Sequence, residues 1–388
     1  MIFLPISVLL LLFGVSIKEA YAAGNTTYVV ALLGQDIQND TVNPDINYEL
    51  VLSTNSTSSI SVDVTGIDGL ITTLTVDDTG KTVHTLDQTK GMNGSEYSNK
   101  SIIVHSADGF FTLQVFITRG DHNYIEGFLG IPIQSLAGPN QPVGQTVYSY
   151  VAATFCDVGG YCQLAVAALN DKTAVSIVLP SHVEEIVCCK GKGYHRSKRD
   201  TAFTLNKFDS IQFESTYDLT GTVIYSFEPI VVFAGSRNVS NGEVIAHTVE
   251  QLVPSSHWGT EYVVTNLGTN GYGDILKIVS HWSDTKITMK GFPSFILKNR
   301  YQTAVRRLDK GFSSHIQASH PIQVVQITGL TYATENETST LSMTVVPSVQ
   351  NAYTEPVTVA CHGAAAQQAQ FYIVTGNQYF GRIHSGCT

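Results

Sequence analysis

Hydrophobic and polar residues alternate with a period of two along most of the chain, and helical periodicity is nearly absent after the N-terminal segment. A period of two places apolar side chains on one face of a strand and polar side chains on the other. Asn170-Asp171 and Ser283-Asp284 supply residues that favour hairpin turns, and Pro229 and Pro321 mark points where a strand restarts. The pattern predicts an all-β protein of antiparallel strands.

The alternating segments recur in a repeat of roughly 95 to 120 residues. Copies begin near Tyr28, Tyr148 and Tyr262, and each holds about seven or eight predicted strands. About three tandem antiparallel β units, each resembling a sandwich, agree with that number of strands. The alternative is a closed β-propeller in which each unit contributes two four-stranded blades. Periodicity does not separate the two architectures.

The repeats divide the chain into predicted segments. The last of them starts near Pro356 and is too short to fold alone, so it either pairs with another unit or belongs to a chain that continues further. The segments are a signal peptide at 1–22, β repeat unit 1 at 23–144, β repeat unit 2 at 145–258, β repeat unit 3 at 259–354, and a partial fourth unit or closing strands at 355–388.

The N-terminal segment has the features of a secretory signal peptide. An apolar run from Ile2 to Ile17 precedes Ala20-Tyr21-Ala22, a small-x-small site for signal peptidase. The alternative is a short membrane anchor. No later stretch reaches the roughly 18 apolar residues that a spanning helix needs. We therefore expect a secreted, extracellular protein that is cleaved after Ala22 and has no membrane span thereafter.

Composition and charge agree with an extracellular protein. Only 14% of the residues are charged, and the formal net charge is −10. An acidic chain without a broad basic surface does not attract a phosphate backbone, so we expect no nucleic-acid partner. Sequons of the form Asn-x-Ser/Thr predict N-glycosylation. They lie at Asn25, Asn39, Asn55, Asn93, Asn99, Asn238 and Asn336.

The six cysteines permit three disulfide bonds in an oxidising compartment. Cys156 and Cys162 flank a Gly-Gly turn and could close a small loop, and Cys361 and Cys387 could pair within the C-terminal segment. A bond within the vicinal pair Cys188-Cys189 would be strained, so each of these two cysteines is expected to find a distant partner or another chain. The spacings match no zinc site.

The span from Val249 to Val264, VEQLVPSSHWGTEYVV, closely resembles the IgGFc-binding protein N-terminal domain family. Its Glu-Gln-Leu, Pro and Trp-Gly-Thr positions are the most distinctive, and Asp218-Leu-Thr-Gly and Glu228-Pro-Ile-Val-Val-Phe-Ala-Gly precede it. The resemblance covers most of residues 28–375 and is strongest over 145–347. It implies a secreted β module, often found beside von Willebrand type D or other adhesive modules in mucus-associated or cell-surface proteins.

Arg119-Gly120-Asp121 follows one predicted strand and precedes another, so it is expected at an exposed turn. An arginine and an aspartate held apart by glycine at a hairpin tip can bridge the acidic pocket of an integrin and its metal ion. Gly-Asp is also ordinary turn chemistry. The tripeptide therefore predicts either integrin recognition or a simple turn.

Arg196-Ser-Lys-Arg199 has the Arg-x-Lys-Arg pattern that secretory proprotein convertases cleave. It lies in an inserted loop whose charge and glycine content predict exposure. Cleavage after Arg199 and an uncut, solvated loop are the two interpretations, and the loop also offers a short basic patch to heparin or an acidic glycan. The patch consists of Lys190, Lys192, Arg196, Lys198 and Arg199.

The remaining candidate residues favour binding over catalysis. Trp258 is expected to be a buried anchor between repeats, with a sugar-stacking platform as the alternative, whereas Trp282 lies near a predicted turn and is the candidate exposed aromatic. Paired carboxylates such as Asp77-Asp78 are typical of turns, and the sequence has no nucleophile elbow, phosphate loop, dinucleotide fingerprint or metal-ligand spacing. We expect no catalytic residues, no metal, no cofactor and no enzymatic activity.

Together the patterns predict a secreted, non-enzymatic β-repeat module that binds extracellular glycoproteins or cell-surface receptors in mucus, extracellular matrix or host defence. Binding surfaces of this kind lie on loops carried by rigid sheets. The alternative is an integrin-binding adhesion ligand that acts through Arg119-Gly120-Asp121. Immunoglobulin Fc binding is not assumed, because the resemblance carries no Fc-binding motif onto residues of this chain.

Overall fold

The structure of the chain is a computed structural model. Every regular element in its described part is a β-strand or a short 3-10 helix, and the strands pair antiparallel. This confirms the all-β prediction; the predicted signal peptide and the segment at 355–388 lie outside the described residues. The described ranges are 25–34, 46–78, 81–119, 125–137, 147–156, 160–183, 195–196, 199–241, 244–267, 273–329 and 341–351.

The first group of strands, which we call unit 1, forms two sheets within the described residues. Their strand orders are β1-β7-β3-β4 and β5-β2-β8-β9. The 3-10 helices η2 and η3 span Gln88–Lys90 and Ile133–Ser135. The strands of unit 1 are β1 (Thr26–Val30), β2 (Ile46–Ser53), β3 (Ile60–Gly66), β4 (Gly69–Val76), β5 (Thr82–Leu86), β7 (Ile102–Ser106), β8 (Thr112–Arg119) and β9 (Ile125–Leu129).

Unit 2 repeats this topology strand for strand, with the orders β10-β16-β12-β14 and β15-β11-β17-β18. Two short strands extend its outer edges: β13 (His195–Arg196) pairs with β14, and β6 (Glu96–Ser98), which comes from unit 1, pairs with β15. The strands of unit 2 are β10 (Tyr148–Val151), β11 (Cys162–Ala168), β12 (Thr173–Val178), β14 (Asp200–Leu205), β15 (Ser210–Ser215), β16 (Val223–Ser226), β17 (Ile230–Asn241) and β18 (Val244–Gln251).

Unit 3 has the same plan, except that one 16-residue strand, β24, replaces two. Its first half pairs with β19 and β21, and its second half with β20 and β25. Pro321 lies within β24, between the two paired halves, so the strand crosses between layers without the predicted restart. The elements are η4 (Ser255–His257), β19 (Gly259–Thr265), β20 (Asp274–Ser280), β21 (Thr285–Met289), β22 (Phe295–Leu297), β23 (Thr303–Leu308), β24 (Ser313–Thr328), β25 (Ser342–Val346) and η5 (Val349–Asn351).

A buried tyrosine near the start of each unit explains part of the sequence repeat. Its hydroxyl donates a hydrogen bond to a backbone carbonyl where the chain crosses from one layer to the other. Burial raises the pKa of Tyr150 and of Tyr262, which keeps both hydroxyls protonated as donors. The three bonds run from Tyr28 to Phe111, from Tyr150 to Ile230 and from Tyr262 to Ile322.

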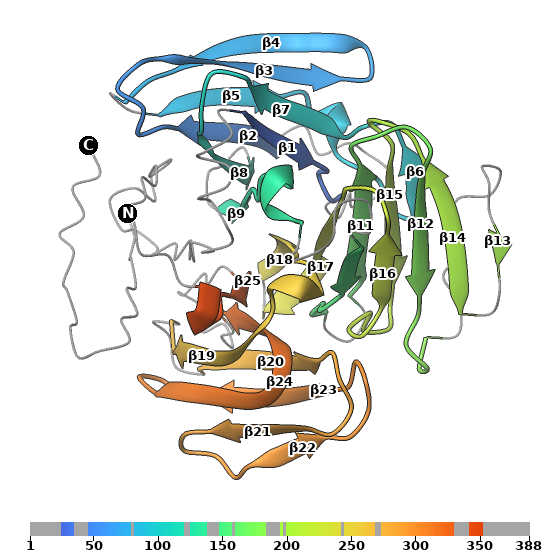
Figure 1. Ribbon diagram of the computed structural model, residues 1–388, viewed down its shortest axis with the longest axis vertical. Coiled ribbons are helices and arrows are strands. Elements are labelled where there is room, and N and C mark those ends of the chain that lie inside the picture. The colour runs from blue at the N-terminus through green and yellow to red at the C-terminus, as the bar shows by residue number, and fades with distance from the viewer. Residues whose placement is uncertain are drawn as a thin grey trace.

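The three units lie around a common centre where β9, β18 and β25 come together (Figure 1), and β18 contacts both of the other two strands. This arrangement is consistent with the propeller alternative. Within unit 3, however, buried residues from both layers form one core, including Tyr262, Ile278 and Ile316, as a sandwich requires. The predicted segment boundaries themselves stay predictions.

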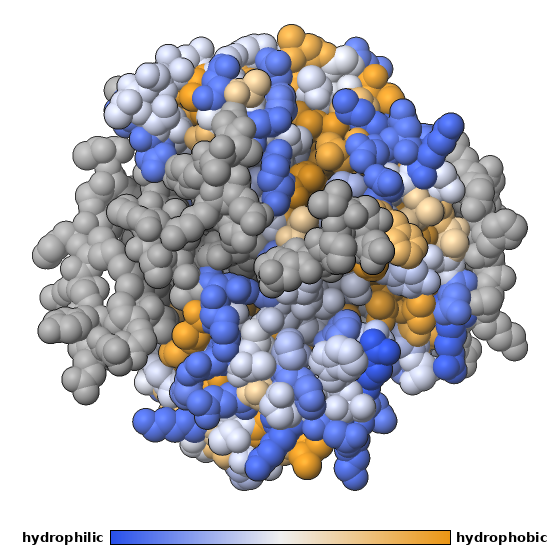
Figure 2. All heavy atoms as spheres, viewed as in Figure 1, coloured by the Kyte–Doolittle hydropathy of each residue, from blue (hydrophilic) through white to orange (hydrophobic). Residues whose placement is uncertain are grey.

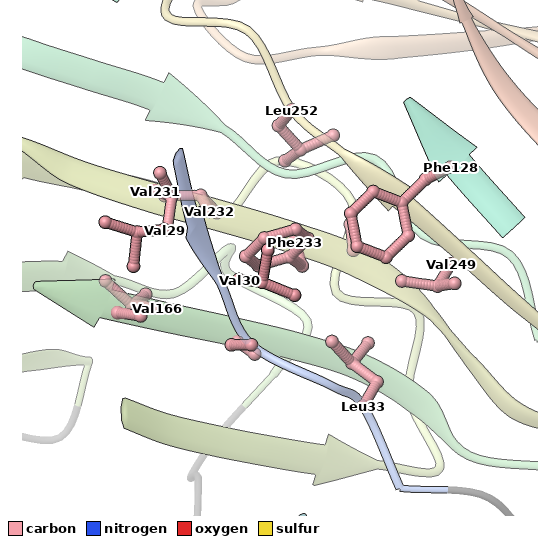
Figure 3. Packing of buried hydrophobic residues seen from close by; sticks show 14 of the residues in the cluster. Val29, Val30, Leu33, Phe128, Val166, Val231, Val232, Phe233, Val249 and Leu252 are labelled. Carbon is pink, nitrogen blue, oxygen red and sulfur yellow. The ribbon is translucent and has the colours of Figure 1, made fainter. Parts of the chain in front are cut away.

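Units 1 and 2 share a continuous hydrophobic core. Figure 3 shows Val29 and Val30 of β1 beside Val232 and Phe233 of β17. The ring of Phe128 in β9 meets that of Phe233 edge-on, with the ring centres 5.2 Å apart. Figure 2 shows hydrophobic side chains reaching the surface between these two units. Units 1 and 2 are therefore packed against each other through a shared core and do not form separate domains.

Cys156 and Cys162 form a disulfide bond, with their Cα atoms 5.1 Å apart. The bond closes the turn before β11, as predicted from the flanking glycines. Cys188-Cys189, Cys361 and Cys387 lie outside the described residues, so their pairing stays a prediction. A disulfide is typical of a chain that folds in an oxidising compartment.

Candidate functional site

A cleft of about 540 Å³ lies between units 2 and 3. We call it the inter-unit cleft. Its volume lies within the range of ligand-binding pockets in proteins. It is lined by Val147, Ser149, Val178, Val223, Tyr225, Ser255, Ser256, His281, Trp282, Arg300, Tyr301 and Pro321.

The outer face of one sheet of unit 2 forms the first wall. Tyr225 of β16 lies opposite Ser149 of β10, and on its other side opposite Ser176 of β12. Because side chains alternate along a strand, Ile224 points into the core while Tyr225 points outward and is 37% exposed. The tyrosine therefore stands on a rigid sheet, which holds its ring in place.

The turn between β20 and β21 places Trp282 on the opposite wall. The Thr285 hydroxyl donates a hydrogen bond of 2.8 Å to the Trp282 carbonyl, and the Asp284 amide donates to Lys298 O. Asp284 has a φ of +53°, a left-handed conformation that aspartate tolerates better than most residues. This closed turn leaves the Trp282 indole 49% exposed, which confirms that Trp282 is an exposed aromatic.

The neighbouring turn, between β22 and β23, supplies Arg300 and Tyr301. It is tied to the end of β20: the Tyr301 amide donates to Ser280 O at 2.9 Å, and the Ser280 amide donates to Gln302 O. Tyr301 has a φ of +59°, an uncommon conformation for an aromatic residue, and such backbones concentrate at functional sites. Hydrogen bonds to the end of β20 thus hold the turn that carries both side chains at the cleft.

Arg300 and the aromatic rings form one stacked group. The guanidinium carbon lies 5.6 Å from the centre of the Trp282 ring and 5.0 Å from that of Tyr301. The His281 ring meets Trp258, Trp282 and Tyr301 edge-on. Burial lowers the pKa of His281, and the Arg300 charge lowers it further, so His281 is neutral near pH 7.

The most distinctive sequence string, from Glu250 to Gly259, lies mainly at the joints between units, and only its Ser255 and Ser256 also line the inter-unit cleft. Gln251 exchanges two hydrogen bonds with the backbone of Ile131, which joins unit 2 to unit 1. Trp258 is 7% exposed and donates to Val253 O, so it is the predicted buried anchor. A Cβ on Gly259 would lie 2.4 Å from that of Ser348, which makes glycine necessary there.

Asp218, from the other sequence string, joins units 2 and 3. Its Oδ2 lies 2.5 Å from Nζ of Lys277 in β20, and this lysine also donates to Thr154 O and to the Thr220 hydroxyl. The Lys277 charge lowers the pKa of Asp218 although burial opposes it, whereas burial lowers the pKa of Lys277. This ion pair therefore links units 2 and 3, whose surfaces form the two walls of the inter-unit cleft.

None of the described residues of the predicted motifs lines the inter-unit cleft. Arg119 ends β8, and Gly120 and Asp121 lie outside the described residues. Arg196 lies in β13 at the outer edge of unit 2, Arg199 is exposed, and Lys190, Lys192 and Lys198 are outside the described residues. Integrin binding and cleavage after Arg199 stay predictions.

The glycosylation sites also stay predictions. The side chains of Asn25, Asn55, Asn93 and Asn99 are exposed, as an acceptor must be. Asn238 lies in β17, while Asn39 and Asn336 are outside the described residues.

Sequence reasoning found Trp282 but missed Tyr225, His281, Arg300 and Tyr301. These residues are separated by up to about 75 positions in the chain and meet only because units 2 and 3 pack together. Among them only His281 lies beside a predicted turn, Ser283-Asp284.

Two further properties bear on the chemistry of the site. In the part of the chain that the structure describes, no group of three or more His, Cys, Asp or Glu side chains could hold a metal ion. Its helices are also too short and too polar for any of them to cross a membrane.

Comparison with known proteins gives one consistent result. A family model described as IgGFc binding protein matches residues 136–381. The human IgGFc-binding protein is 28% identical over 197 residues, which cover 51% of this chain and 3% of that protein. The chain therefore spans a small part of this relative's length. No solved structure gives a significant match.

Proposed function

Since this chain belongs to the IgGFc-binding protein family, we propose that it is a secreted, non-enzymatic module that binds other extracellular glycoproteins through the inter-unit cleft. The observation that carries the proposal is the cleft itself, in which Trp282, Tyr225, Tyr301 and Arg300 converge from two units. Exposed tryptophan, tyrosine and arginine are the residues that contribute most to binding surfaces. Mucus, extracellular matrix and host defence are the settings we propose for it.

Secretion is supported by the N-terminal apolar run with its small-x-small site and by the Cys156–Cys162 disulfide. The printed name of the human relative says that it binds immunoglobulin Fc. We do not extend that ligand to this chain, because the chain spans 3% of that protein and the cleft residues alone point to no immunoglobulin.

Replacing Trp282 with alanine is expected to weaken binding to purified gastric mucin about thirtyfold, the cost of a typical tryptophan hot spot of about 2 kcal/mol. The turn survives because its hydrogen bond uses the Trp282 carbonyl and not the indole. Biolayer interferometry with the secreted protein measures the effect. Tyr217, which is 59% exposed and does not line the cleft, provides the control Tyr217→Ala. Equal binding by all three proteins would contradict the proposal.

Integrin binding through Arg119-Gly120-Asp121 is the second candidate. Antiparallel pairing of Thr118 with Ile125 makes the segment between them the connection of a hairpin, as the prediction requires. Cell attachment to the immobilised protein is then expected to fall to background with Asp121→Glu, which lengthens the acidic arm by one methylene. Attachment that survives this change would remove integrin recognition as a function.

A further inference from the structure

The inter-unit cleft differs in charge from the rest of the protein. The chain has a formal net charge of −10, yet the cleft lining contains the cation Arg300 and neither an aspartate nor a glutamate. A site that excludes acidic side chains in an acidic protein is complementary to a negatively charged ligand.

Arg300 is held in position and its charge is not neutralised. Its Nε donates to His281 O at 3.3 Å and its Nη2 donates to the Tyr301 hydroxyl at 2.8 Å. Within the described residues, no carboxylate lies at ion-pair distance from this guanidinium. A guanidinium with a fixed orientation and unused donors is suited to a carboxylate or a sulfate, because it loses little freedom on binding.

The rings beside Arg300 indicate what carries that negative charge. Trp282 and Tyr225 present partly exposed aromatic faces, which carry the negative lobe of the ring quadrupole. The C–H groups on one face of a pyranose ring are slightly positive and pack against such a surface. Hydroxyls that can exchange hydrogen bonds with sugar hydroxyls also line the cleft, at Ser149, Ser255 and Ser256.

His281 adds a buried, unpaired nitrogen to the group of rings beside Arg300. Its Nδ1 is buried and has no hydrogen-bond partner in the described part of the chain. A buried polar atom without a partner is costly unless a bound molecule or water satisfies it. Its ring contacts Trp282 and Tyr301, so this atom belongs to the same stacked group as Arg300.

We propose that the inter-unit cleft binds an anionic pyranoside, with the sugar ring on Trp282 and its carboxylate or sulfate on Arg300. This inference rests on the proposed function and names the ligand class of the same site. A sialic acid and a sulfated hexose share the required chemistry, a saccharide ring next to a negative group.

Titration calorimetry with 3′-sialyllactose, 3′-sulfolactose and lactose tests the inference, because lactose is the neutral core of the other two. The first adds a sialic acid residue with its carboxylate, and the second adds a sulfate. The wild-type protein is expected to bind at least one of the two anionic sugars at least tenfold more tightly than lactose, and the tighter one identifies the source of the charge. Arg300→Gln is expected to abolish this difference in affinity between the anionic sugars and lactose. Arg306→Gln removes an equal charge from a residue that stacks on Phe295 outside the cleft, and it should preserve the difference.

Equal affinity for all three sugars, or an Arg300→Gln protein that still distinguishes them, would overturn the inference. Its failure is distinguishable from failure of the proposed function. If mucin binding depends on Trp282 but survives sialidase treatment and desulfation, the cleft binds glycoproteins through another group, such as an acidic peptide. In that case the proposed function stands and the anionic sugar is wrong.

Discussion

Replacing Asp218 with asparagine is expected to lower the free energy of unfolding by about 3 kcal/mol, because the buried Lys277 ammonium then loses its counter-ion. The Lys277 side chain is only 6% exposed, while that of Asp218 is 45% exposed. The Lys277 ammonium therefore cannot reach solvent when the carboxylate is removed. Chemical denaturation of the mature protein, followed by intrinsic fluorescence, measures the change.

A second substitution separates charge from packing. Lys277→Met in the Asp218→Asn background removes the stranded charge, and most of the lost stability should return, because apolar residues often replace a buried ion pair at little cost. The cycle isolates the coupling between the two side chains. The half-exposed pair Glu261–His315 provides a control, since Glu261→Gln should change stability by less than about 0.5 kcal/mol. An Asp218→Asn variant as stable as this control would show that the ion pair does not hold units 2 and 3 together.

Replacing Glu250 with glutamine is expected to stabilise the protein at neutral pH and to have no effect near pH 4. Burial raises the pKa of Glu250 well above its ordinary value, and the nearby Glu126 carboxylate raises it further. In the folded protein Glu250 therefore stays protonated at a pH where it ionises in the unfolded chain. Below the pKa that Glu250 has in the unfolded chain, the raised folded-state pKa does not reduce the free energy of unfolding. As the pH rises above that unfolded-state pKa, the free energy of unfolding falls.

The increase in the free energy of unfolding caused by Glu250→Gln should grow by about 1.4 kcal/mol per pH unit above roughly pH 4.3, until the pH reaches the pKa of Glu250 in the folded protein. Oε2 of Glu126 lies 2.7 Å from Nδ1 of the buried His247, whose other ring nitrogen contacts Gln163. Unfolding free energies from pH 4 to pH 8 measure the difference. Glu228 is exposed, so Glu228→Gln is the matched control. A difference in unfolding free energy between Glu250→Gln and the wild type that does not change with pH would contradict the prediction.

Much of the fold could be predicted because each repeat contains local sequence patterns that indicate its strands. Period-two alternation marks the strands, and Tyr28, Tyr150 and Tyr262 recur because each closes the same layer crossing. The Cys156–Cys162 loop was visible from its short spacing and its glycines. The continuity of β24 through Pro321 could not be predicted from the sequence. A proline interrupts a strand only where its missing N–H would have to donate a hydrogen bond to a neighbouring strand, and no such donor is needed between the two layers.

The cleft was less accessible from the sequence. Trp282 could be recognised because it lies beside a turn, but Arg300 matters only because the turn that carries it is tied to Ser280 and faces Tyr225 of another unit. The β6 strand comes from unit 1 but pairs with β15 of unit 2, so its formation likewise depends on packing between repeats. Contacts between units are long-range, and a single sequence has no local signal for them.

Hydrogen–deuterium exchange of the secreted protein, measured with and without saturating purified gastric mucin, shows directly whether the inter-unit cleft is the binding surface. Binding there is expected to slow exchange in the peptides that contain Ser149, Tyr225, Trp282 and Arg300, and to leave exchange unchanged at the outer edge strands β4 and β5. Protection confined to those edge strands or to the segment around Arg119, with the cleft peptides unaffected, would contradict it.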